Sequence, residues 1–79
     1  DKVNSIAQVK VEPFKITPNP ANSLIHIQYP LSHKSKITIL DISGKYIGSY
    51  KNNIIDVSIL QAGLYFVKIG DLTSKFIKL

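Results

Sequence analysis

The chain has 79 residues, a formal net charge of +5 at pH 7 and no cysteine. This length allows one small hydrophobic core and excludes a second domain with a core of its own. The absence of cysteine excludes disulfides and thiolate zinc sites. No stretch approaches the roughly 18 apolar residues of a membrane helix, so membrane insertion is not expected.

The positive charge comes from ten lysines, and the chain has no arginine. Arginine supplies the planar fork that grips phosphates and guanine edges, so its absence weakens a nucleic-acid interpretation. The lysines are also scattered and do not alternate with aromatic residues, as an RNA-stacking surface requires. We interpret the charge as a solvated surface and a guard on strand edges, with nucleic-acid binding as the minor alternative.

Residues 1–11 are weakly patterned and are expected to form a linker into a folded domain of residues 12–79. Within that domain, prolines break helical periodicity, and many isoleucines and valines favour strands. Alternating apolar and polar residues between turn clusters predict seven short strands, near 14–17, 23–29, 35–41, 45–51, 54–57, 63–69 and 73–79. This spacing is typical of a compact antiparallel β-sandwich.

Two turns have a specific physical mechanism. Pro18 and Pro20 fix two φ angles around Asn19, which predicts a stiff crossover, without strand pairing, that carries the chain from one sheet to the other. Asp41 is expected to open a type I turn by accepting backbone N–H bonds. Gly44 is then expected to take the left-handed position before the next strand.

The last predicted strand has apolar residues on both faces. Ile77 and Leu79 lie on one face, and Phe76 and Lys78 lie on the other. We expect Ile77 and Leu79 to complete one sheet, so that removing this strand lowers the melting temperature by many degrees. As the final strand of a sheet, it is also expected to present an exposed edge.

The sequence contains no catalytic constellation. The acidic residues stand alone, no serine lies in a Gly-x-Ser-x-Gly elbow, and Gly63 is not part of a phosphate-binding loop. His26 and His33 lie without a nearby carboxylate motif, and we interpret them as a strand histidine and a loop histidine rather than a metal site. Neither an enzyme nor a cofactor or metal is expected.

Several segments in a fixed order match the motifs of a known family. They are Phe14–Asn22 followed by the strand Leu24–Tyr29, then Ile39–Ile47, then Ile55–Ile69, and finally Ser74–Leu79. Each motif alone is weak. Together, over about residues 12–79, they resemble the type A C-terminal sorting domain of the type IX secretion system of Bacteroidetes.

The resemblance implies an Ig-like antiparallel β-sandwich at the end of a larger secreted cargo protein. The cargo reaches the periplasm by an N-terminal signal of its own, which is not expected within this chain. The outer-membrane translocon and its shuttle protein recognise the domain, and a cell-surface sortase usually removes it and joins the cargo to anionic lipopolysaccharide. The chain is then an address label for secretion or the cell surface, and residues 1–11 are the expected neighbourhood of the cut.

Ten residues match the family's motifs: Pro18, Asn19, Pro20, Asp41, Gly44, Lys45, Gly63, Tyr65, Lys75 and Lys78. Gly63 is expected to serve backbone geometry, and Tyr65 is expected in the core with its hydroxyl at the rim. Lys45 is expected to be exposed and available to a partner. Lys75 and Lys78 either guard the edge of the last strand or contact the translocon, and both interpretations stay open.

The alternative is an Ig-like adhesive or carbohydrate-binding module of a surface protein. Such a module needs an exposed row of aromatic side chains, for which the candidates are Tyr29, Tyr46 and Tyr50. Binding of the isolated domain to a glycan array, with no export defect on its deletion, distinguishes this module from a sorting signal.

Overall fold

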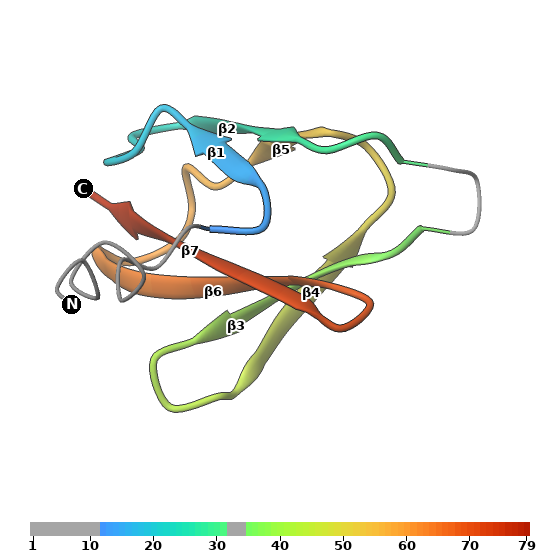
Figure 1. Cartoon of the computed structure of the whole chain (residues 1–79). Coiled ribbons are helices and arrows are strands. Elements are labelled where there is room, and N and C mark those ends of the chain that lie inside the picture. Colours follow the sequence, from blue (N-terminus) through green and yellow to red (C-terminus); the bar gives the residue numbers. More distant parts are fainter. Residues whose placement is uncertain (1–11, 32–34) are drawn as a thin grey trace, which may run out of the picture.

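The protein folds into seven strands, with no helix in the described part of the chain (Figure 1). The computed structural model describes residues 12–31 and 35–79, so the expected linker of residues 1–11 and His33 lie outside it. The strands are β1 (Lys15–Thr17), β2 (Leu24–Gln28), β3 (Ile37–Asp41), β4 (Tyr46–Tyr50), β5 (Ile54–Asp56), β6 (Gly63–Ile69) and β7 (Leu72–Lys78). The bounds of each strand agree with those of a predicted strand to within two residues. The described residues contain no helix able to cross a membrane.

The strands form two sheets that pack face to face. Sheet A has the order β1-β2-β5, and sheet B has the order β4-β3-β6-β7. Every pair of neighbouring strands is antiparallel. In Figure 1 sheet A lies above sheet B. The buried side chains of the core come from strands of both sheets. The prediction of an all-β, Ig-like antiparallel sandwich is confirmed.

The core is built from alternate residues of the strands. Ile25 and Ile27 of β2 are fully buried, as are Ile37 and Ile39 of β3. Leu24, on the opposite face of β2, is 49% exposed. Successive side chains of a strand point to opposite faces, so an apolar residue at every second position is sufficient to build one buried face. The period of two in the sequence therefore places the core of both sheets.

The buried face of β7 is the reverse of the one predicted. Ile77 is 48% exposed and Leu79 is 64% exposed, whereas Phe76 is fully buried. The pairing register decides this, because Phe76 lies opposite Tyr65 of β6 and shares its face. The two rings stack with their centroids 5.5 Å apart. The expectation that Ile77 and Leu79 complete the sheet was wrong, although β7 is an edge strand of sheet B as expected.

The Pro18-Asn19-Pro20 segment is not a crossover between sheets. It connects β1 to β2, which are neighbours in sheet A. The chain instead first changes sheet between β2 and β3. Both prolyl bonds of the segment, Thr17–Pro18 and Asn19–Pro20, are cis. The segment also takes part in pairing, since Ala21 directly after it forms a bridge to Lys78 of β7.

Candidate functional site

The four motif segments meet at one end of the sandwich. In sheet B, Asp41 of β3 pairs with Tyr65 of β6, and Gly63 pairs with Lys78 of β7. Lys78 also forms the bridge to Ala21, which brings in the first motif. We call this region, at the left of Figure 1, the motif end; it consists of residues 18–21, 41–45, 61–65 and 75–79.

The side chain of Asn19 takes the place of a neighbouring strand beside β7. Its Oδ1 accepts a hydrogen bond from the backbone N–H of Ile77 at 2.9 Å, and its Nδ2 donates to the carbonyl oxygen of Lys75 at 3.4 Å. A carboxamide carries both an acceptor and a donor, so one side chain satisfies two backbone groups of an edge strand. The Pro-Asn-Pro motif is thus part of the pairing of the last strand.

Ala21 continues this cap along β7. Its N–H donates to the carbonyl of Ile77 at 2.7 Å, and its carbonyl accepts from the N–H of Leu79 at 2.8 Å. Successive residues of a strand turn their backbone groups to alternate sides. The odd-numbered residues of β7 therefore face outward, and the even-numbered residues face β6. Asn19 and Ala21 together cap the outward groups from the carbonyl of Lys75 to the N–H of Leu79.

Asp41 holds the turn between β3 and β4 as predicted. Its Oδ1 accepts hydrogen bonds from the N–H of Ser43 at 2.9 Å, the hydroxyl of Ser43 at 2.6 Å and the N–H of Lys45 at 2.9 Å. The Ser43 hydroxyl first, and then the Lys45 N–H, lower the pKa of Asp41 below its usual value. Gly44 has a φ of +88°, the left-handed region that glycine adopts freely. Lys45 is exposed on this turn, as expected.

Tyr65 and Gly63 form the corner that leads into β6. Tyr65 is 7% exposed, and its hydroxyl donates to the carbonyl of Gln61 at 2.7 Å. A tyrosine hydroxyl bonded to the chain a few residues upstream is the tyrosine corner of Ig-like sandwiches. Gly63 has a φ of +150°, which side chains of L-residues rarely adopt. Both residues have the structural positions that the sequence predicts.

The two lysines of the terminal motif differ in position. Lys75 is exposed on the outer face of sheet B, at the edge of the sandwich. Lys78 is only 6% exposed, on the face of β7 that Phe76 occupies, and its Nζ donates to the carbonyl oxygen of Leu79 at 2.9 Å. A lysine can bury its alkyl stem against apolar surface and keep its ammonium group bonded. Lys78 therefore does not guard the outer edge, and Lys75 remains the candidate for partner contact.

One residue of the motif end and one residue next to it were missed by sequence reasoning. Ala21 is fully buried and pairs with β7, but a small residue in a proline-rich turn gives no periodic signal. Ser74 is 3% exposed, and its hydroxyl donates to the carbonyl of Phe14 at 2.9 Å. The period of two from Phe76 identifies the face of Ser74, although its polar type suggests an exposed position.

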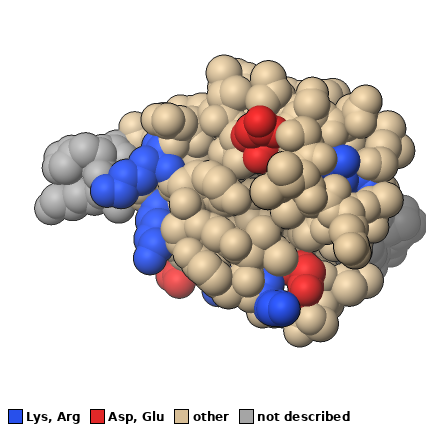
Figure 2. Space-filling model, turned by 180° about the vertical axis from the view of Figure 1, so that it is seen from behind, with Lys and Arg blue, Asp and Glu red and all other residues tan. Residues whose placement is uncertain are grey.

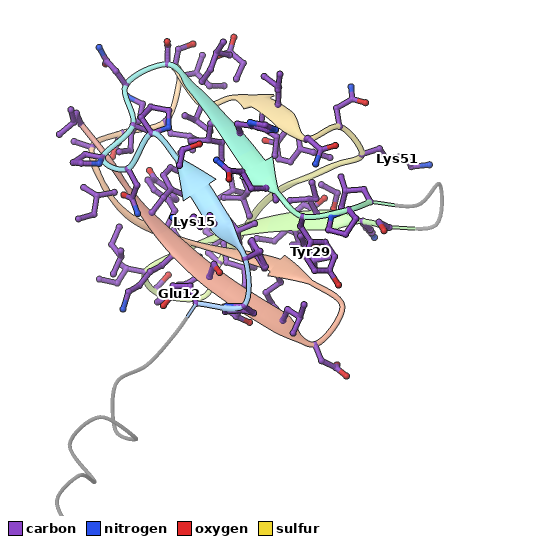
Figure 3. All side chains as sticks on the ribbon, turned by 45° about the horizontal axis from the view of Figure 1, so that its top comes forward. Glu12, Lys15, Tyr29 and Lys51 are labelled. Atoms are coloured by element: carbon purple, nitrogen blue, oxygen red, sulfur yellow. The ribbon has the colours of Figure 1, made fainter. Side chains whose placement is uncertain are left out.

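A seam runs between β1, at the edge of sheet A, and the outer edge of β7. A hollow of about 400 Å³ in this seam is lined by Lys15 and Asn19, among others. A second hollow, of about 230 Å³, is lined by Phe66 and Thr73. Glu12 and Lys75 line both hollows. Figure 3 shows β1 and β7 side by side here, with Glu12 just before β1 and Lys15 on it. The space beside β7 is therefore continuous with the motif end.

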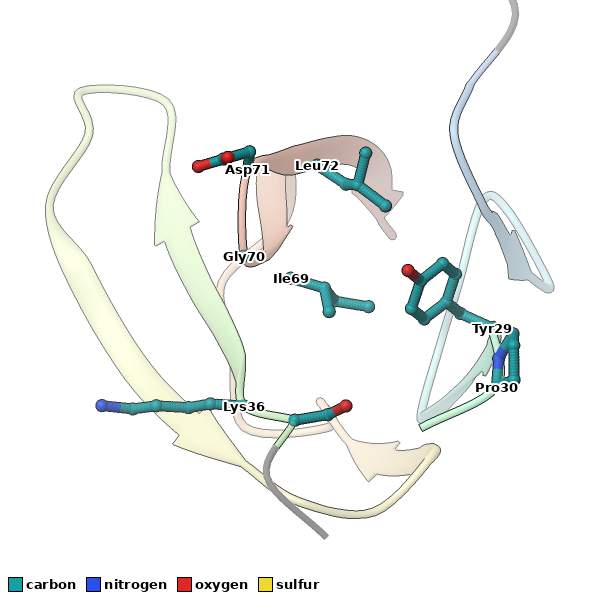
Figure 4. A pocket seen from close by; sticks show the side chains of 8 residues that line it. Tyr29, Pro30, Lys36, Ile69, Gly70, Asp71 and Leu72 are labelled. Carbon is teal, nitrogen blue, oxygen red and sulfur yellow. The ribbon is translucent and has the colours of Figure 1, made fainter. Parts of the chain in front are cut away.

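Another hollow lies at the opposite end of the sandwich (Figure 4). It has a volume of about 570 Å³. It is lined by Tyr29 directly after β2, by Ile69 of β6 and by Leu72 of β7. None of the ten residues that match the family's motifs lines this hollow. It is therefore not part of the candidate site.

The three tyrosines of the alternative module do not form an exposed row. Tyr29 packs its ring against Phe14, with the centroids 5.8 Å apart, and Tyr50 packs against the core. Of the three, Tyr46 is the exposed one, at 59%. A flat aromatic platform for a sugar is thus not built from these residues.

Metal and nucleic-acid chemistry find little support in the described residues. Within residues 12–31 and 35–79, no group of three His, Cys, Asp or Glu side chains is placed to hold a metal ion. His26 is exposed on β2. The face in Figure 2 is mostly uncharged, and its lysines do not form a continuous basic stripe.

The fold is that of a small Ig-like β-sandwich domain, and it brings the four motif segments together at one end. The family model described as "Secretion system C-terminal sorting domain" matches residues 15–79. The chain belongs to this family of type IX secretion sorting domains, and it is a sorting signal for export toward the cell surface or secretion. No curated protein and no solved structure matches the chain.

Proposed function

We propose that the motif end is the surface by which the type IX export apparatus recognises this domain. The shuttle protein and the outer-membrane translocon bind residues 12–79 in the periplasm and carry the cargo, attached N-terminally, across the outer membrane. A cell-surface sortase then cuts in the neighbourhood of residues 1–11 and removes the domain. The domain supplies binding and a cleavable tail, and it carries out no catalysis.

One observation supports this proposal above the others. Motifs that lie far apart in the sequence come together at one end of one sheet, through the pairs Asp41–Tyr65 and Gly63–Lys78 and the bonds of Asn19 to β7. Tyr65 and Lys78 are buried supports, whereas Asn19, Lys45 and Lys75 are exposed. An exposed polar set on a rigid scaffold is what a recognition surface requires.

The test fuses residues 1–79 behind a periplasmically targeted reporter in a type IX-competent bacterium. The wild-type fusion is expected at the surface or in the medium. Replacing both Lys45 and Lys75 by Ala removes two exposed charges from the motif end and is expected to retain the reporter in the periplasm. The matched control replaces Lys36 and Lys51, both exposed and away from the motif end, and Figure 3 shows Lys51 projecting from the molecule.

The removal step has its own measurement. Mass spectrometry of the surface reporter is expected to show a product that has lost residues 12–79. A wild-type fusion that stays in the periplasm contradicts the recognition proposal. A reporter that reaches the surface with the domain intact contradicts the sortase step and leaves recognition standing.

A further inference from the structure

The outer edge of β7 is capped along only half of its length. Asn19 and Ala21 occupy the outward groups from the carbonyl of Lys75 onward. Before that point, the N–H and carbonyl of Thr73 and the N–H of Lys75 also face outward by strand alternation. No described residue bonds to these three groups. Consecutive unpaired backbone groups on an edge strand form a template for another strand.

Space for a strand exists beside this open half. The hollow of about 230 Å³ is lined by Thr73, Ser74 and Lys75 from β7, with Phe66 of β6 and Glu12. The seam hollow of about 400 Å³ adjoins it and shares Glu12 and Lys75. A polypeptide in extended conformation would therefore reach the outward groups of Thr73 without displacing a described element.

The charge beside the open half is mainly positive. Lys75 is exposed there, Lys68 pairs with Thr73 on the outer face of sheet B, and Lys15 lines the seam from β1. Glu12 is the acidic residue that lines the two hollows. Opposite charges on neighbouring strands stabilise their pairing, and like charges oppose it. A strand added here is favoured if it carries acidic side chains beside Lys75.

We propose that an extended, acidic segment of the export apparatus adds to sheet B as a strand along Thr73–Lys75, with Asn19 and Ala21 setting where its pairing ends. The proposal rests on the proposed function, because it names how the apparatus binds the domain. Backbone hydrogen bonds supply the affinity of such strand addition, and side chains beside the strand supply its specificity.

A second copy of this chain is a poorer occupant. Each chain carries a net charge of +5, so two copies repel each other. The cap at Asn19 further shortens the length over which two identical edges meet.

The sharpest test removes an outward N–H and leaves the β6–β7 ladder intact. Thr73→Pro does this, because the Thr73 N–H points away from β6 and Leu72 before it is already extended. The matched control is Ser49→Pro at the opposite edge of the same sheet. The N–H of Asp41 bonds to the carbonyl of Lys45, so the odd-numbered residues of β3 turn their backbone groups toward β4. Thr38 therefore faces away from β4, and the N–H of Ser49, which lies opposite Thr38, points away from β3.

Both variants are compared in the reporter fusion, after thermal melting confirms that each folds. Thr73→Pro is expected to lower export at least about ten-fold. The variant loses one backbone hydrogen bond to the added strand, and its proline ring lies where that strand must pair. Together these are expected to cost more than the roughly 1.4 kcal/mol of binding free energy that corresponds to a ten-fold change. Ser49→Pro is expected to export like the wild type. If the wild type is exported and Thr73→Pro matches it, strand addition is overturned while the sorting function stands. If the wild type is not exported, the sorting function itself fails.

Charge reversal gives a second test that leaves the backbone unchanged. Lys75→Glu is expected to lower export about ten-fold, and Lys51→Glu, also exposed, is expected to have no effect. Wild-type export of Lys75→Glu overturns the acidic partner.

Sedimentation of the wild type and of Thr73→Pro measures whether this edge pairs with a second copy of the chain. A wild-type dimer that Thr73→Pro abolishes without loss of export assigns this edge to self-association and overturns the proposal.

Discussion

The two halves of β7 share one strand and one core face but differ at their outer edge. From the Lys75 carbonyl to Leu79, Asn19 and Ala21 occupy the outward backbone groups. From Thr73 to the Lys75 N–H, the same edge borders two hollows and lysine side chains. An edge strand with unpaired backbone groups can pair with strands of other proteins, and a charged side chain on that edge limits such pairing. The capped half is tied into the fold by these hydrogen bonds, and the open half is where we propose that a partner strand adds.

The cap also joins the two ends of the domain. Asn19 lies 56 residues before Lys75 and 58 before Ile77 in the sequence. Closing a loop of this length costs more entropy than closing a local turn. We therefore expect the cap to form together with the strands that bring Asn19 and β7 close to each other. The first and last motifs therefore form one structural unit, and a substitution in one is expected to weaken the hydrogen bonds of the other.

The largest effect is expected where both halves depend on the same side chain. Phe76→Ala removes a fully buried ring that stacks on Tyr65 and leaves a cavity between the sheets. The expected cost is about 3–5 kcal/mol, which for a domain of this size unfolds it or lowers its melting temperature by about 15 °C or more. Ile77→Ala, on the exposed face, is the control. Equal losses from the two substitutions, measured by circular dichroism, contradict the observed facing of β7.

A smaller effect is expected beneath the open half. Ser74→Ala removes the donor to the buried carbonyl of Phe14. An unsatisfied buried acceptor costs about 1–3 kcal/mol, measurable by urea unfolding. Thr73→Ala, one residue away and exposed, is expected to change stability little. No difference between the two variants shows that the Ser74 bond does not hold β1 to β7.

The capped half is expected to respond to Asn19. Asn19→Ala removes two exposed hydrogen bonds to β7 and is expected to cost about 1 kcal/mol, or about 4–8 °C in melting temperature. Asn22→Ala, in the same loop and exposed, is the matched control. A melting temperature of Asn19→Ala equal to that of the control argues against the cap.

The smallest effect is a pH dependence away from β7. The pKa of Asp41 is below its usual value of 3.8 in the folded state, mainly through the Ser43 hydroxyl. The ionised carboxylate therefore stabilises the fold above that usual value, and this stabilisation is lost as pH falls through the lower folded pKa. The Ser58 hydroxyl and N–H lower the pKa of Asp56 in the same way, so it contributes in the same window. Between about pH 5 and pH 2, the melting temperature is expected to fall more in the wild type than in Asp41→Asn. Parallel curves contradict this role of Asp41.

The sequence predicts the strands and turns well because their signals are local. Ile25 with Ile27 and Ile37 with Ile39 mark buried faces by alternation, and Asp41 marks its turn by the chemistry of one carboxylate. The facing of β7 was not predictable in this way, because both of its faces carry an apolar residue. The register with β6 decides it, and a register is a long-range property.

The candidate site shows the same limit. The motif residues were identified from the sequence, but their convergence rests on strand pairs and on the bonds of Asn19 to β7. The Pro-Asn-Pro segment was predicted to be stiff, which its fixed φ angles explain. Its hydrogen bonds to β7 depend on where β7 lies in the fold, and the residues around Asn19 in the sequence do not predict that position. Lys78 similarly looks like a surface lysine until its neighbours on the Phe76 face are known.

The division of β7 into two halves is tested most directly by amide hydrogen exchange, read by NMR at single residues. The Ile77 N–H, bonded to Asn19, is expected to exchange slowly, and the Thr73 and Lys75 N–H groups are expected to exchange rapidly. Asn19→Ala is expected to speed exchange at Ile77 and leave Phe76, which faces β6, protected. Exchange at Ile77 as rapid as at Thr73 in the wild-type domain contradicts the account.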